Sequence, residues 1–110
     1  MKKGSMKEAK KLFYAILNGK LSKREGLEHI YRIANKKKIL KGYYFGVKGI
    51  ILKQNDNPYS LKVESLKRNE IKYLIKKMEY YLSSRFTNEF DRGYMYAWID
   101  YLRYHIGETE

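Results

Sequence analysis

Residues 39–54 read ILKGYYFGVKGIILKQ, and the conformation of this stretch decides the fold of the chain. The turn-forming residues NDNP follow at 55–58, and then YSLKVE at 59–64, where apolar and polar residues alternate. Two apolar runs separated by Asn, Asp and Pro are typical of a β-hairpin. We therefore predict a β-hairpin with strands over residues 44–54 and 59–64.

A helix over residues 39–53 is the alternative for the same stretch. It would align two Gly-Tyr pairs, at 42–43 and 93–94, as a weak internal repeat. However, Gly42, Gly46 and Gly49 would together cost a helix about 2–3 kcal/mol relative to alanine. This cost favours the strand.

Four other segments have the apolar spacing of amphipathic helices. Ser5 with Glu8, and Ser22 with Glu25, are capping-box pairs that mark where the first two helices begin. The four predicted helices cover residues 5–18, 22–35, 66–83 and 88–106. Short turns join the first to the second and the third to the fourth, so each pair should form an antiparallel hairpin. The first turn also resembles a helix-turn-helix, but Glu25 stands where that motif has an apolar residue.

The predicted fold is therefore mainly α (α+β), with two antiparallel helical hairpins flanking a β-hairpin. An all-α bundle is the alternative. The length of 110 residues and the 44% of hydrophobic residues suit one globular domain. We expect a single domain over residues 1–110, made of a basic N-terminal half, 1–53, and a charge-balanced helical hairpin, 66–106.

The net charge of +12 comes entirely from the first half of the chain. Residues 1–53 contain 15 Lys and Arg residues against 3 acidic residues, whereas residues 54–110 contain 9 of each kind. A basic half joined to a balanced half indicates an anion-facing surface on a scaffold. The predicted partner is a polyanion, and we expect a non-enzymatic protein that binds nucleic acid, RNA or DNA.

The candidate phosphate-binding residues follow one another along the basic half. They are Lys23, Arg24, Arg32, Lys36, Lys37, Lys38, Lys41 and Lys48. Tyr43 and Tyr44 lie between two of these lysines, and aromatic rings among cations can stack unpaired bases. This arrangement favours RNA or single strands over duplex.

A protein-interaction module is the alternative from a different functional class. Tyr94, Trp98 and Tyr101 recur on one face of the last predicted helix, and aromatic residues are common in protein interfaces. In this interpretation the chain forms a homodimer through the helices at 66–83 and 88–106, or binds an acidic protein.

Residues 24–29, REGLEH, form an Arg-x4-His pattern on a predicted helix. The pattern resembles the signature of the small helical ribonucleases of the HEPN superfamily. The resemblance covers six residues. It implies a metal-free RNA-cleaving site at a dimer interface, with Arg24 as the phosphate-binding group and His29 as the acid–base group. Outside it, no residue is predicted to be catalytic.

The composition excludes several classes of protein. The chain has no Cys, which rules out disulfides and thiolate zinc sites, and its two His residues predict no metal site. Its glycines match neither a P-loop nor a dinucleotide-binding pattern, so no cofactor is expected. No apolar run approaches the roughly 18 residues of a membrane span, and the basic N-terminus lacks a signal-peptide core, which predicts a cytoplasmic protein. The abundance of Lys, Ile, Glu and Tyr is thermophile-like.

Overall fold

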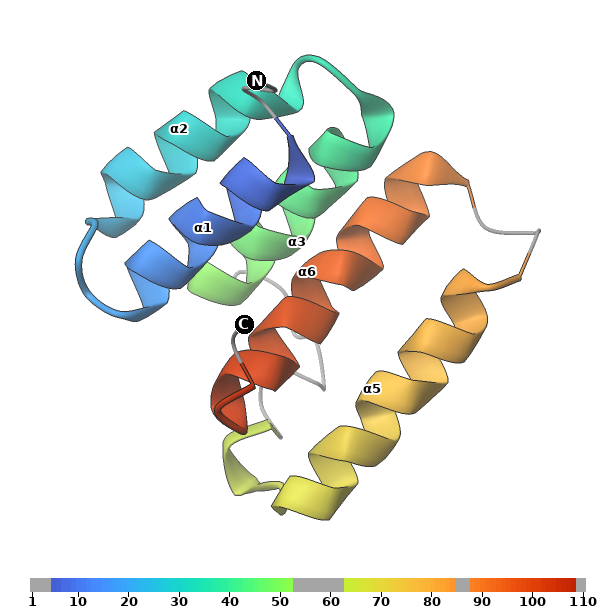
Figure 1. Ribbon diagram of the computed structural model, residues 1–110. Coiled ribbons are helices and arrows are strands. Elements are labelled where there is room, and N and C mark those ends of the chain that lie inside the picture. The colour runs from blue at the N-terminus through green and yellow to red at the C-terminus, as the bar shows by residue number, and fades with distance from the viewer. Residues whose placement is uncertain (1–4, 53–62, 85–87, 109–110) are drawn as a thin grey trace.

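The computed structural model describes residues 5–52, 63–84 and 88–108, and in these residues the chain is helical (Figure 1). The elements are α1 (Met6–Leu17), α2 (Lys23–Ala34), α3 (Lys38–Leu52), the 3-10 turn η1 (Val63–Ser65), α5 (Arg68–Leu82) and α6 (Glu89–His105). The four helices predicted around the central stretch are confirmed to within two residues at each end. Both predicted antiparallel pairs, α1 with α2 and α5 with α6, are present (Figure 1).

The helix ends follow from local sequence. The hydroxyl groups of Ser5 and Ser22 accept hydrogen bonds from the backbone N–H groups three residues later, at 3.2 and 3.1 Å. These bonds satisfy N–H groups that the first helical turn leaves unpaired. Gly19 and Gly107 follow the ends of α1 and α6 with φ of 79° and 76°, a conformation that glycine adopts without strain.

The predicted β-hairpin is wrong. Residues 44–52 of its first strand lie within α3, residues 53 and 54 lie outside the described residues, and no strand occurs in the described part of the chain. Residues 59–62, most of the second predicted strand, lie outside the described residues. Val63, near the end of that strand, belongs to η1 and is 1% exposed. The all-α alternative fits the structure.

The segment at 38–52 is helical because its glycines allow it to touch α6. A Cβ atom added to Gly42 would lie 1.9 Å from the carbonyl oxygen of Phe90, and one added to Gly46 would lie 2.7 Å from the Cβ of Ala97. Only glycine permits so close an approach of two backbones. At Gly42 and Gly46, the intrinsic cost of about 1 kcal/mol for a glycine in a helix is therefore offset by this packing.

The crossing of α3 and α6 is reciprocal. A Cβ atom added to Gly93 would lie 1.8 Å from the carbonyl oxygen of Ile39, just as Gly42 lies against Phe90. Ile39 and Phe90 are 51 positions apart in the sequence, and so are the two glycines. The two helices run in the same direction (Figure 1) and are related by a local two-fold axis. The two Gly-Tyr pairs of the weak internal repeat, at 42–43 and 93–94, are therefore the residues that meet at this crossing.

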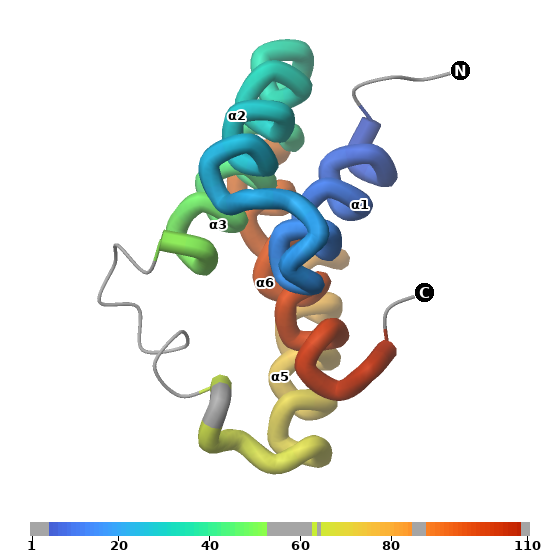
Figure 2. The backbone as a smooth tube through the Cα atoms, turned by 90° about the vertical axis from the view of Figure 1, so that its left-hand side faces the viewer, coloured from blue at the N-terminus to red at the C-terminus, as the bar shows by residue number. Residues whose placement is uncertain are grey.

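The hairpins α2–α3 and α5–α6 lie on either side of that axis. Their second helices, α3 and α6, meet in the centre, while α2 and α5 form the outer edges (Figure 1). Helix α1 packs on α2, α3 and α6 from one side, opposite η1 (Figure 2). The ring of Phe13 in α1 lies 6.2 Å from that of Tyr43 and 6.4 Å from that of Tyr101. The largest fully buried side chains are Phe13, Ile30, Leu40, Tyr43, Val47, Val63 and Leu102.

Candidate nucleic-acid interface

Five of the predicted phosphate-binding residues gather where α2 ends and α3 begins. They are Arg32, Lys36, Lys37, Lys38 and Lys41, all exposed, and we call them the basic end. Helices α1, α3 and α6 also begin at this end of the bundle (Figure 1). Each helix N-terminus carries a partial positive charge, which adds to that of the side chains. An ion pair of 3.5 Å with Glu28 offsets part of the charge of Arg32.

Lys23 and Arg24 lie away from the basic end. They are the first two residues of α2, and a rise of 1.5 Å per residue separates them from the end of that helix by about 16 Å. The structure therefore does not bring these two residues together with the lysines that follow α2. Lys48, the last predicted cation, lies further along α3, with its Nζ 5.9 Å from the centre of the Tyr44 ring.

Four aromatic rings form a continuous row next to these cations. We call this row the aromatic strip, and it consists of Tyr31 from α2, Tyr44 and Phe45 from α3, and Phe90 from α6. Successive ring centres are 5.3, 5.9 and 5.5 Å apart. The exposed fractions of Tyr31, Phe45 and Phe90 are 51%, 53% and 36%. A contiguous row of exposed aromatic rings is a candidate binding surface.

Sequence reasoning selected only Tyr44 from this strip. Tyr31 and Phe90 belong to other helices, 13 and 46 positions away from Tyr44 in the sequence. No local pattern connects residues so far apart. The available signal was the helical spacing of Tyr44 and Phe45 relative to the lysines near them. It was not recognised because residues 44–54 were interpreted as a strand.

Tyr43 lies in the interior and is left out of the interface. Its side chain is 0% exposed, and its hydroxyl donates a 2.7 Å hydrogen bond to Oδ2 of Asp100. Each residue of a helix is rotated by about 100° from the one before it, so residues 43 and 45 point about 200° apart. Tyr43 therefore faces α1, while Phe45 faces the opposite side of α3. Only one residue of the predicted tyrosine pair can therefore reach a ligand.

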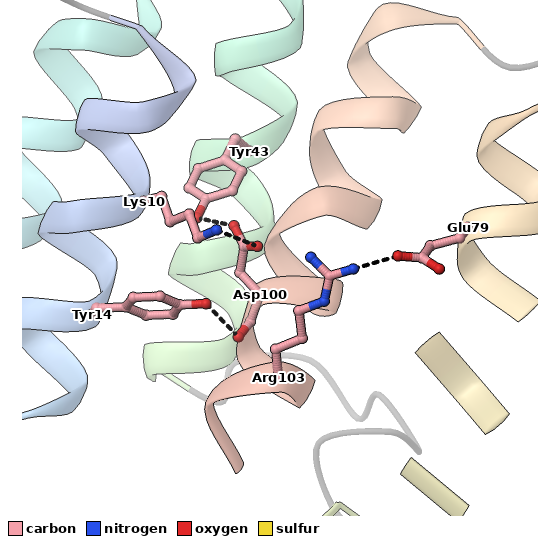
Figure 3. Close-up of polar contacts among 6 residues, drawn as sticks. All are labelled: Lys10, Tyr14, Tyr43, Glu79, Asp100 and Arg103. Atoms are coloured by element: carbon pink, nitrogen blue, oxygen red, sulfur yellow. Dashed lines mark hydrogen bonds and ion pairs between the residues drawn. The ribbon is translucent and has the colours of Figure 1, made fainter. Parts of the chain in front are cut away.

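A buried polar cluster joins α1, α3 and α6 (Figure 3). Besides Tyr43, the carboxylate of Asp100 has Nζ of Lys10 at 3.9 Å, and its backbone carbonyl accepts a 3.1 Å hydrogen bond from the hydroxyl of Tyr14. Burial raises the pKa of Asp100, while Tyr43 and Lys10 act in the opposite direction. Burial, together with Asp100, also raises the pKa of Tyr43. No pattern in the sequence pointed to this cluster.

The two residues of the HEPN-like pattern do not converge on α2. Arg24 and His29 are both exposed, and residues five positions apart in a helix point about 140° apart. Among residues 5–52, 63–84 and 88–108, no three His, Asp or Glu side chains are grouped as metal ligands would be. None of the helices described there combines the length and apolar character needed to cross a membrane.

The aromatic face proposed for a protein partner is mostly inside the fold. Trp98 is 3% exposed and Tyr101 is 8% exposed, and their ring centres are 5.9 Å apart. Tyr94 is half-buried. Trp98 and Tyr101 therefore serve mainly to pack α6 against its neighbours.

No protein family, curated protein or solved structure was found to match this chain. Its function is therefore inferred from the surface of the molecule itself.

Proposed function

We propose that this chain binds single-stranded nucleic acid, with RNA favoured, through the aromatic strip and the basic end, and that it does so without catalysis. The observation that carries the proposal is the row of four rings contributed by three helices, with lysines beside it. Bases of a single strand stack on exposed rings, and lysines bind the phosphates that connect them.

The surface suits a single strand better than a duplex. A duplex hides the faces of its bases by stacking them on one another, so exposed rings would have no base face to contact. A recess between the first turns of α3 and α6, lined by Lys38, Asn88, Glu89 and Phe90, lies at one end of the strip. Because Glu89 repels phosphate, we expect the nucleic-acid backbone to run on the Lys38 side of this recess.

The experiment is a fluorescence-anisotropy titration of labelled single-stranded RNA, single-stranded DNA and duplex probes. Phe45→Ala and Tyr31→Ala should each weaken single-strand binding by about 1–3 kcal/mol, the usual effect of losing one stacking ring. Tyr80→Ala is the matched control, because Tyr80 is 81% exposed but lies on α5, outside the strip. Equal losses in all three variants, or tighter binding of duplex, would contradict the proposal.

The same titration tests the alternative of a ribonuclease. The RNA probe is examined on a denaturing gel after each titration. Cleaved probe with the parent protein, together with intact but bound probe with His29→Ala, would assign the chain as a nuclease. Intact probe throughout is the result expected here.

A further inference from the structure

Among residues 5–52, 63–84 and 88–108, no α-helix is the counterpart of α1 across the local two-fold axis between α3 and α6. On α3, the side chain that meets α1 is Tyr43, whose ring lies 6.2 Å from that of Phe13. The residue 51 positions later is Tyr94 of α6. Rotation about the axis would therefore place a second helix over Tyr94, against α5 and α6.

A groove lies at this place. It has a volume of about 290 Å³ and is lined by Leu74, Lys77, Met78 and Tyr81 of α5 and by Tyr94, Met95 and Trp98 of α6. We call it the α5–α6 groove. Helix α5 borders it as α2 borders the site of α1. Except for Lys77, its lining is apolar or aromatic, and Tyr81 is 49% exposed.

Helix α1 shows what such a site accepts. It presents Ala9, Phe13 and Ile16, which are 0%, 0% and 7% exposed, at the spacing of one helix face. Because the two hairpins share their central crossing, we infer that the α5–α6 groove binds an amphipathic helix of another protein, packed on the second hairpin as α1 packs on the first. This inference does not depend on the proposed nucleic-acid binding.

Charge decides the chemistry of the partner. Lys77 lines the groove, and Lys76, the residue before it in α5, is exposed. The partner helix should therefore carry acidic residues beside its apolar stripe. A second copy of this chain suits the groove less well, because a symmetric dimer through α5 would bring the same lysines face to face.

The probe is a peptide of residues 5–19 of this chain, blocked at both ends, in which Lys7, Lys10 and Lys11 are replaced by Glu. It keeps the apolar face of α1 and has an acidic flank. The peptide with the native lysines is the charge control. Displacement of α1 from its own site is disfavoured, since a tethered helix competes at an effective concentration on the order of mM.

The chain provides its own reporters. Trp98 is its single Trp and lines the groove, so binding should change tryptophan fluorescence. Of its four Met residues, Met78 and Met95 line the groove, while Met6 lies in α1. With ¹³C-methyl methionine, the signals of Met78 and Met95 should shift on titration and that of Met6 should stay in place. A shift of Met6 would show that the peptide replaces α1 and would overturn the inference.

Substitution at the rim of the groove completes the test. Tyr81→Glu should weaken peptide binding at least about tenfold, and the matched variant Tyr80→Glu, one residue away but not in the groove, should bind like the parent. The peptide with native lysines should bind at least about tenfold more weakly at low salt. Absence of saturable binding, equal binding by both variants, or a parent dimer that Tyr81→Glu makes monomeric would overturn the inference.

Discussion

Gly42 of α3 and Gly93 of α6 each lie against the backbone of the other's helix. The carbonyl oxygen that a Cβ atom would meet is 1.9 Å away for Gly42 and 1.8 Å away for Gly93. The two contacts are equivalent under the local two-fold axis, so they form and break together. This pair of glycines sets the distance between the two central helices.

Substitution of either glycine by alanine should destabilise the protein. Alanine favours a helix by about 1 kcal/mol over glycine, but its methyl group has no room in this crossing, and overpacking typically costs 1–3 kcal/mol or more. We expect Gly42→Ala and Gly93→Ala each to lower the free energy of unfolding by about 2 kcal/mol, measured by urea denaturation followed by circular dichroism.

The double variant provides the control for this mechanism. Once one methyl group has pushed α3 and α6 apart, the second adds little, so the double variant should lose less than the sum of the single losses. Lys41→Ala, at an exposed position of α3, should leave the stability within about 0.5 kcal/mol. Additive losses would show that the two glycines act independently.

Asp100 should make the stability depend on pH. Burial raises its pKa in the folded protein above the ordinary value of 3.8, so the folded chain holds this proton more tightly than the unfolded chain. The resulting stabilisation is complete below that value and is lost as the pH rises through the folded pKa. Relative to the parent, Asp100→Asn should therefore gain stability as the pH rises above 3.8.

The measurement is urea denaturation of both proteins across that pH range. Asp91→Asn, which changes an exposed residue of the same helix, is the matched control and should show no such gain. A constant difference between Asp100→Asn and the parent at all pH values would contradict the assignment to Asp100.

The basic end should determine the salt dependence of nucleic-acid binding. Each phosphate contact with a single strand contributes about 0.7 to the slope of log affinity against log salt concentration. Replacing Lys36, Lys37 and Lys38 by Ala should therefore reduce the magnitude of the slope by about 2. Anisotropy titrations at several salt concentrations measure it.

A triple variant on the other side of the bundle is the control. Replacing Lys72, Lys76 and Lys77 of α5 by Ala removes the same charge from exposed positions of a different helix. Its slope should stay close to that of the parent. If both triple variants changed the slope equally, binding would depend on total charge and not on the basic end.

The ion pair between Glu79 of α5 and Arg103 of α6 should matter little. The side chains are 45% and 35% exposed, so water screens their attraction, and such pairs contribute about 0.2–1 kcal/mol. A double-mutant cycle with Glu79→Gln and Arg103→Gln should give a coupling energy in that range. A larger coupling would identify this pair as a main connection between the two helices.

Local sequence predicted four of the five α-helices that the described residues form, because capping residues and apolar spacing act within a few positions. Ser5 and Ser22 illustrate this, since each caps the helix that begins after it. The helix at 38–52 could not be predicted in this way. Its conformation depends on backbone contacts with residues about 50 positions later, and propensity alone favoured a strand there.

The same distinction between local pattern and long-range contact applies to the candidate site. Composition indicated a basic surface, and five of the cations do gather at one end of the bundle. Tyr43 was assigned to the site because it is next to Tyr44 in the sequence. In the helix, however, the side chain of Tyr43 points inward and that of Phe45 points outward. Phe90 could join the aromatic strip only after the second hairpin had docked on the first.

The parallel direction of α3 and α6 also constrains how the chain folds. Antiparallel helices can zip together from a short turn, whereas these two parallel helices must be brought together across a loop of some 36 residues, with α5 in between. Closing that loop has an entropic cost before any central contact forms, which slows the search. Neither hairpin can bury its inner face alone, so we expect them to assemble in one cooperative step. The contacts at Gly42 and Gly93 should then be formed in the transition state for folding.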